Sequence, residues 1–229
     1  MKKEFKKAFL ELFFPKFCFG CQKEKAYLCK DCQAVLDISG FHQKTEISGI
    51  EDLYFALEYK SPLLKNLVKN FKYKPFIKEL SKPLASLITA HLQLLDTSLL
   101  FYDQNSDFVL IPVPLEKRKL KRRGFNQARE IAKEISIFLN LPLIDNALIK
   151  NKTTKAQVSL SEKERIKNII GAFECQNQEK IKGKNVLLVD DIYTTGATMR
   201  EASEVLKKAG AKKIIGMVIA RAVLGQDIV

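Results

Sequence analysis

The hydrophobic pattern along the chain alternates between short apolar runs and longer segments with helical spacing. The clearest apolar runs are Val186–Val189 and Ile214–Ala220, and such runs are typical of strands buried on both faces of a sheet. Further strands are expected over residues 53–59, 107–113, 141–149 and 171–175, and helices over 62–72, 76–95, 126–139 and 197–209. Strands that alternate with helices predict an α/β fold built on a parallel, two-sided sheet.

The N-terminal part of the chain has a different pattern. Residues 1–14 carry apolar side chains at helical spacing, with lysines toward the other face, and a cysteine cluster follows. We expect the apolar face either to pack against the cysteine-rich module or to enter a bilayer interface while the lysines meet anionic headgroups. Residues 41–50 lack a clear period and predict a linker between an N-terminal module (1–40) and the α/β domain (51–229).

Composition narrows the classes of partner and the compartment. A chain of 229 residues can bury one full-sized core with a small accessory module beside it. Lys and Arg number 39 against 26 Asp and Glu, a net charge of +13 that favours nucleic acid, anionic lipid or phosphate-rich small molecules. Lysines that serve only solubility are the alternative explanation. Apolar runs stop well short of the ~18 residues that span a bilayer, and no signal peptide is recognisable, so we expect a cytoplasmic protein.

Four cysteines form two Cys-x-x-Cys pairs separated by seven residues: Cys18, Cys21, Cys29 and Cys32. Two-residue spacing lets one tight turn aim two thiolates at a common point, and two such turns complete a tetrahedral zinc site. Gly20 is expected to supply a positive φ inside the first turn. Four thiolates leave no open coordination position, so the zinc is predicted to be structural. Redox pairs and coincidence are the alternatives. The remaining cysteine, Cys175, is expected to be buried in a strand.

A phosphate-binding pattern follows the apolar run at 186–189. The strand ends in Asp190 and Asp191, and residues 194–198 then lead into a helix whose first N–H groups favour a phosphate. The two carboxylates can accept hydrogen bonds from ribose hydroxyls and help to hold Mg²⁺. This stretch is similar to the phosphoribosyl pyrophosphate signature of type I phosphoribosyltransferases. The predicted site consists of Asp190, Asp191, Thr194, Thr195, Gly196, Ala197 and Thr198, and the two acids are the candidate catalytic residues.

A strongly basic segment follows the strand expected over 107–113. Six of residues 116–123 are cationic, and a loop there would lie at the same edge of the sheet as the phosphate site. Such a loop could neutralise pyrophosphate, follow a nucleic-acid backbone, or remain an ordinary solvated segment. Phe125 offers a surface on which a base could stack. The candidate residues are Arg118, Lys119, Arg122, Arg123 and Phe125.

Several motifs in this order resemble the ComF family of late competence proteins. They are the four-cysteine module, Pro-Val-Pro at 112–114, Arg-Arg-Gly-Phe-Asn-Gln at 122–127, Val-Asp-Asp-Ile-Tyr-Thr-Thr-Gly-Ala-Thr at 189–198, and Ala-Arg at 220–221. The resemblance implies a type I phosphoribosyltransferase-like core over 51–229 with a small zinc module before it. By position, residues 190 and 191 would bind ribose and Mg²⁺, residues 194–198 the 5′-phosphate, and Arg118, Arg122 and Arg123 pyrophosphate or DNA.

The resemblance also implies a role in natural transformation. The protein would handle incoming single-stranded DNA on the cytoplasmic side of the inner membrane, with helicase-type or recombination-mediator partners and a peripheral membrane contact left open. Thr194 stands where many purine-salvage relatives have an Asp, so a purine acceptor is not indicated. We therefore predict a protein of DNA uptake that binds phosphoribosyl pyrophosphate. The alternatives are a Mg²⁺-dependent phosphoribosyltransferase acting on a nucleobase or another small acceptor, and a regulator that senses the metabolite.

Overall fold

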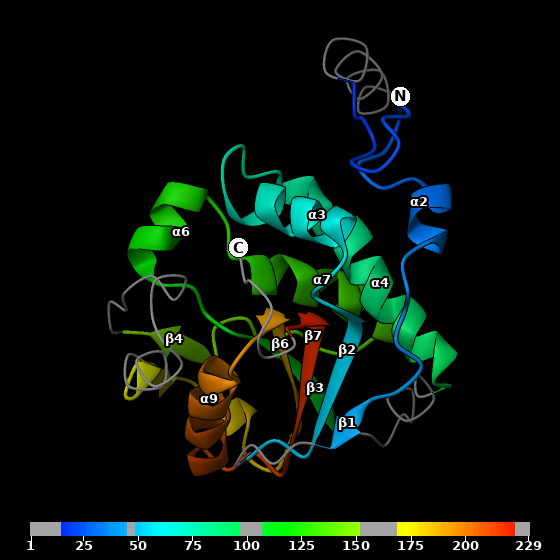
Figure 1. The fold of residues 1–229 in the computed structure, drawn as a ribbon. Helices are drawn as coiled ribbons and strands as arrows, with labels where there is room; N and C mark the ends of the chain where they lie inside the picture. The colour runs from blue at the N-terminus through cyan, green and yellow to red at the C-terminus, as the bar shows by residue number, and fades with distance from the viewer. Residues whose placement is uncertain (1–14, 45–48, 97–106, 152–168, 223–229) are drawn as a thin grey trace, which may run out of the picture.

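The computed structural model describes residues 15–44, 49–96, 107–151 and 169–222. The expected amphipathic helix over 1–14 lies outside these residues, as does most of the polar segment 150–165. A five-stranded sheet in the order β1-β2-β7-β6-β3 lies at the centre (Figure 1). Its strands are β1 (Gln43–Lys44), β2 (Asp52–Glu58), β3 (Phe108–Pro112), β6 (Asn185–Tyr193) and β7 (Lys213–Arg221).

The sheet is parallel except at one edge. Strands β2, β7, β6 and β3 run in the same direction, and only the two-residue β1 is antiparallel to its neighbour β2. Val186–Val189 and Ile214 are fully buried, because the apolar runs of β6 and β7 are covered from both faces. The predicted α/β fold with a parallel, two-sided sheet is confirmed.

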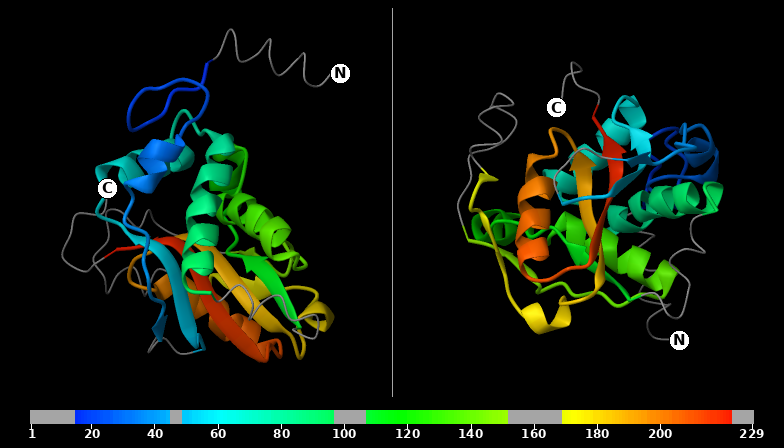
Figure 2. Two further views of the ribbon diagram at one scale, coloured as in Figure 1. Left: turned by 90° about the vertical axis from the view of Figure 1, so that its right-hand side faces the viewer. Right: turned by 90° about the horizontal axis from the view of Figure 1, so that it is seen from below.

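Helices cover both faces of the sheet, as the two views of Figure 2 show. One face is covered by α3 (Pro62–Lys72), α4 (Ser81–Leu94) and α7 (Gln127–Leu139), which share one apolar core with the sheet. The other face is covered by α9 (Ala197–Lys208), beside the antiparallel pair β4 (Leu148–Lys150) and β5 (Phe173–Cys175). Short turns of helix are α2 (Lys30–Ala34), η1 (Lys78–Leu80) and η3 (Gln178–Lys180).

The basic segment after β3 is a helix, where the sequence pattern led us to expect a loop. Helix α6 spans Lys117–Arg123 and ends at Gly124, whose φ of 82° lets its N–H bond to the carbonyl of Leu120 at 2.8 Å. Lysine, arginine and leucine are good helix formers, and a glycine in the left-handed conformation is a common helix end. The cations are therefore spread around a helix rather than along an extended strand of chain.

The segment before β2 runs along that strand. The N–H of Ser39 donates to the carbonyl of Ala56 at 2.8 Å, and Gln43 and Lys44 pair with β2 as β1. Part of the predicted linker 41–50 is thus used to cover an otherwise open sheet edge. Cys175 is half-buried in β5 rather than buried. Among the described helices, none combines the length and the apolar character needed to cross a bilayer.

Candidate functional site

The carboxyl end of β6 presents the two acids of the predicted phosphate-binding pattern. Asp190 and Asp191 follow four fully buried residues, and each carboxylate accepts a hydrogen bond from the next backbone N–H, at 2.8 and 2.7 Å. The chain then turns at Gly196, with φ of 72°, and enters α9. The N-terminus of α9 thus points its dipole toward the space above the two acids, which is where an anionic group is stabilised.

A lysine from another part of the chain reaches these acids. Lys72, the last residue of α3, places its Nζ 2.8 Å from Oδ1 of Asp191. Burial works against the charged ammonium, but the attraction of Asp191 and Asp190 outweighs burial and raises the pKa of Lys72. Lys72 therefore stays charged and is the counter-charge of the two carboxylates.

One positive charge does not balance two neighbouring carboxylates. Burial, together with repulsion from Asp191, raises the pKa of Asp190 to about 7. A divalent cation beside Asp190 and Asp191 would stabilise the charged form of both carboxylates. Mg²⁺ is normally bound through one or two carboxylates together with phosphate oxygens. The donor set of Asp190 and Asp191 fits that chemistry.

Cationic side chains line the same cavity. Lys119 and Arg123 from α6 line it, and so does Lys150 from β4, in a volume of about 260 Å³. Burial lowers the pKa of Lys150 to about 8, and repulsion from Lys119 adds to the effect. Burial also lowers the pKa of Lys119. These partly desolvated cations repel one another, so an anion that binds between them would stabilise their charged forms.

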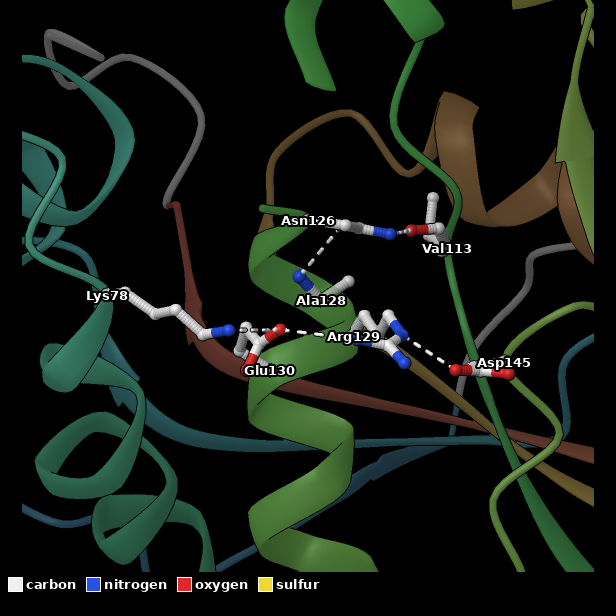
Figure 3. A network of polar contacts seen from close by, with 7 residues as sticks. All are labelled: Lys78, Val113, Asn126, Ala128, Arg129, Glu130 and Asp145. Atoms are coloured by element: carbon white, nitrogen blue, oxygen red, sulfur yellow. Dashed lines mark hydrogen bonds and ion pairs between the residues drawn. The ribbon is translucent and has the colours of Figure 1, made fainter. Parts of the chain in front are cut away.

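The segment that follows β3 is fixed to the start of α7, and both line the cavity. Asn126 donates from Nδ2 to the carbonyl of Val113 at 3.0 Å and accepts from the N–H of Ala128 at 3.1 Å (Figure 3). The same close-up shows α7 anchored further on, because Lys78 pairs with the buried Glu130 at 3.2 Å and Arg129 pairs with Asp145 at 2.6 Å. Asn126 therefore caps the helix and joins the Pro-Val-Pro segment to it.

The four N-terminal cysteines converge on one point. Their sulfur atoms all lie within 4.8 Å of one another, and the Sγ atoms of Cys21 and Cys29 are 3.6 Å apart. Zn–S bonds of about 2.3 Å in a tetrahedron require S···S separations of roughly 3.8 Å. The backbone N–H of Cys29 also points at Sγ of Cys18 at 3.4 Å, as donors around metal-bound thiolates do. The residues present fit a structural zinc site.

The expected reason for Gly20 was wrong. Its φ is not positive; the positive φ angles nearby belong to Gln22 (62°) and Lys25 (88°), which follow the first cysteine pair. A Cβ atom on Gly20 would lie 2.6 Å from Sγ of Cys32 and 3.4 Å from Cδ2 of Leu63. Glycine is required because the sulfur cluster and helix α3 approach the backbone closely.

Comparisons with known proteins agree with this architecture. The phosphoribosyl transferase domain family matches residues 119–224. Competence protein F of Haemophilus influenzae is 32% identical over 212 residues, which cover 90% of each chain. The chain therefore belongs to the ComF family. Another relative, competence protein ComFC of Bacillus subtilis, is 27% identical over 85% of this chain and 79% of its own. The DNA utilization protein YhgH of Escherichia coli (strain K12) is 31% identical over 46% of this chain and 45% of its own.

In this ComF-family protein, the structure brings most of the predicted site residues together. Six of the seven residues of the phosphate pattern line the cavity, and the exception, Thr195, accepts a hydrogen bond from the N–H of Ala197 at 3.4 Å. Lys119, Arg122 and Arg123 line it as well, whereas Arg118 is exposed and does not. Ligand binding by these residues remains a prediction.

Phe125 is the predicted residue that the structure contradicts. Its side chain is only 6% exposed, and its ring packs on Phe71 of α3 with 5.3 Å between ring centroids. The apolar ring is withdrawn from solvent between α3 and α7, so it cannot serve as an open surface for a base.

Several side chains that line the cavity were not among the predicted site residues, and three of them matter for its charge and rim: Lys72, Tyr73 and Lys150. The first two end a helix that precedes the family domain, and no pattern in the sequence ties that helix to β6. The signal for Lys150 was available, because it directly follows the buried strand residue Leu148 and the apolar Ile149. Charged residues at strand ends are frequent, however, and the pairing of β4 with β5 was needed to place this one.

Proposed function

We propose that this ComF-family protein binds phosphoribosyl pyrophosphate with Mg²⁺ in the cavity and acts in DNA uptake by handling single-stranded DNA. One observation carries the proposal: two carboxylates, a helix N-terminus and a cationic wall surround one cavity of about 260 Å³. The arrangement matches the ligand group by group. The 5′-phosphate fits the N-terminus of α9, the ribose fits Asp190 and Asp191, and the pyrophosphate fits the wall of Lys119, Lys150 and Arg123.

The part of the proposal that concerns DNA rests on the exposed cations of α6 and on sequence similarity to the relatives named above. Helix α6 faces the cavity with some of its cations and solvent with others, and Lys117, Arg118 and Lys121 are exposed. The relatives carry names that refer to competence and to DNA utilization. A zinc module of residues 1–40 would present further lysines beside a phosphoribosyltransferase-like domain over 51–229. Helicase-type or recombination-mediator partners, a cytoplasmic location and a peripheral membrane contact belong to the same proposal.

Calorimetric titration with phosphoribosyl pyrophosphate tests the ligand. Binding should require Mg²⁺, and Asp191→Asn should weaken it at least tenfold, since the change removes a ribose contact and frees Lys72. The matched control is Asp145→Asn, which breaks the ion pair with Arg129 outside the cavity. Affinity that is unchanged without Mg²⁺, or in the Asp191 variant, would contradict the assignment.

A salt titration of single-stranded DNA binding tests the second part. If Arg122 and Arg123 each meet a phosphate, their replacement by alanine should weaken binding at all sequences and reduce the salt slope by about one per residue. Lys133→Ala, an exposed change on α7, removes the same charge elsewhere and serves as the control. An unchanged slope in both arginine variants would place DNA elsewhere, and a preference for specific duplex DNA would favour a regulator.

A Mg²⁺-dependent phosphoribosyltransferase is the second candidate. The observation in its favour is Asp190, whose raised pKa of about 7 suits a group that exchanges a proton near neutral pH. Pyrophosphate release with nucleobases and with DNA ends as acceptors separates the two functions. Release that depends on Asp190 would establish an enzyme, whereas tight binding without release would leave a binding protein.

A further inference from the structure

An aromatic side chain stands exposed at the rim of the cavity. Tyr73 directly follows Lys72 at the end of α3, and 41% of its surface is accessible. Eight large apolar side chains are exposed among the described residues, and Tyr73 is the one of these that lines the cavity. Isolated apolar residues on a protein surface need no explanation, but an exposed aromatic ring beside a ligand cavity indicates a contact with the ligand.

The ring is attached to a fixed backbone. The N–H of Tyr73 donates to the carbonyl of Lys69 at 2.8 Å, and its own carbonyl accepts from the N–H of Phe76 at 2.7 Å. The neighbouring Lys72 is tied to Asp191 by the 2.8 Å ion pair. The position of Tyr73 is therefore set relative to the carboxylates that would bind ribose. An aromatic ring with few rotatable bonds loses little entropy on contact with a ligand.

The surroundings of Tyr73 suit a flat, aromatic group. Arg122 and Arg123 line the same cavity, and Arg123 lies within electrostatic range of Tyr73. Guanidinium groups and tyrosine rings both stack on nucleobases. Tyr59 and Phe125 do not offer such a surface, because they are 7% and 6% exposed.

We propose that Tyr73 is the stacking platform for the nucleobase of a nucleotide whose phosphorylated sugar occupies the cavity. The ligand class is a base attached to a 5′-phosphorylated sugar, which both a free nucleoside monophosphate and the 5′ end of a DNA strand contain. The inference rests on the proposed function, because the sugar phosphate must lie at Asp190 and Asp191 for its base to reach the ring. The sequence predicts a stacking surface at Phe125, whereas this proposal places it at Tyr73, directly after α3.

The composition of the chain allows a direct optical test. The sequence contains no tryptophan, so Tyr73→Trp creates a single indole at the proposed platform. AMP should quench its fluorescence, whereas ribose 5-phosphate, which has the same sugar phosphate without the base, should not. Ile137→Trp, at a position 70% exposed on α7, reports non-specific quenching. Equal quenching by AMP in both variants would overturn the proposal.

Affinity measurements supply the second test. Stacking on an aromatic side chain is expected to make AMP bind on the order of tenfold more tightly than ribose 5-phosphate. Tyr73→Ala should weaken AMP about tenfold more than it weakens ribose 5-phosphate, and Tyr73→Phe should preserve the difference. Equal losses for the two ligands in Tyr73→Ala would overturn the inference even if phosphoribosyl pyrophosphate still binds, in which case the proposed function stands.

Titration of the Tyr73→Trp protein with DNA oligonucleotides distinguishes a DNA end from a free nucleotide as the source of the base. A 5′-phosphorylated oligodeoxythymidylate that quenches the Tyr73→Trp protein more strongly than its unphosphorylated counterpart assigns the platform to a DNA end. Quenching by AMP alone assigns it to a free nucleotide. A protein that binds none of these probes and no phosphoribosyl pyrophosphate would refute the proposed function together with this inference.

Discussion

Asp190→Asn should stabilise the ligand-free protein, although it removes a residue of the candidate site. Asp190 sits half-buried beside Asp191 at the end of β6, and burial with the neighbouring charge raises its pKa to about 7 from an ordinary value of 3.8. The folded protein therefore binds this proton more tightly than the unfolded chain does. Stability from this group is fully present below about pH 4 and is lost as pH rises through 7.

The magnitude follows from the two pKa values. A tenfold change in proton affinity corresponds to about 1.4 kcal/mol. Relative to acidic pH, Asp190 therefore lowers the free energy of unfolding of the ligand-free protein by up to about 4 kcal/mol at pH 8 and by about 2 kcal/mol at pH 5.5. Asparagine has nearly the same shape and carries no charge. We expect it to recover about 1–3 kcal/mol at pH 8 and less at pH 5.5, since the carboxyl group is almost fully protonated in the folded protein there and its cost is smaller.

Urea unfolding at pH 5.5 and pH 8 measures this difference. The buffer must contain neither Mg²⁺ nor a chelator, so that the carboxylates stay free while zinc is retained. Asp191→Asn is the matched comparison and should destabilise the protein by about 2 kcal/mol, because it leaves Lys72 without its partner at 2.8 Å. A lower stability of Asp190→Asn at pH 8, or the same effect at both pH values, would contradict the raised pKa of Asp190 as the source of the cost.

Three further changes test the packing around the site. Gly20→Ala should reduce zinc retention in a chelator competition, because its Cβ would approach Sγ of Cys32 to 2.6 Å, whereas Gly40→Ala meets nothing within 4 Å and should behave like the unchanged protein. Phe125→Ala should lower the free energy of unfolding by about 3 kcal/mol through loss of its packing on Phe71, with unfolding curves as the measure; a stable variant with weakened DNA binding would contradict the burial argument. Removal of zinc should weaken phosphoribosyl pyrophosphate binding several-fold in calorimetry, and unchanged affinity would show that the two sites are independent.

The parts of the fold that local pattern determines could be predicted from the sequence. The apolar runs of β6 and β7 favour strands, because a short run that is apolar at successive positions and ends in charged or turn residues is typical of a strand covered on both faces. The acids and the glycine after β6 then follow from the chemistry of a helix N-terminus. The cysteine spacing likewise determines which four sulfur atoms meet, since two short turns suffice to bring them together.

The parts that depend on distant contacts could not be predicted. Lys72 lies more than a hundred residues before Asp191, and no local pattern shows that its ammonium reaches that carboxylate. Phe125 follows a run of cations, which made it look solvent-facing, but the turn at Gly124 directs it toward Phe71. The run of charge in the basic segment favours a solvated loop, but its lysines, arginines and leucine also favour the helix that it forms.

Helix α3 connects the two parts of the protein that the sequence shows as separate motifs. At its first turn, Leu63 lies against the backbone of Gly20 in the cysteine cluster, and at its last residue Lys72 holds Asp191. Eleven residues span about 16 Å, so one rigid element reaches from the cysteine cluster to Asp191. A shift of the module would therefore move Lys72 and Tyr73 together, and with them both the counter-charge and the proposed base platform. If α3 couples the sites, zinc loss should weaken AMP more than ribose 5-phosphate, because AMP uses both residues.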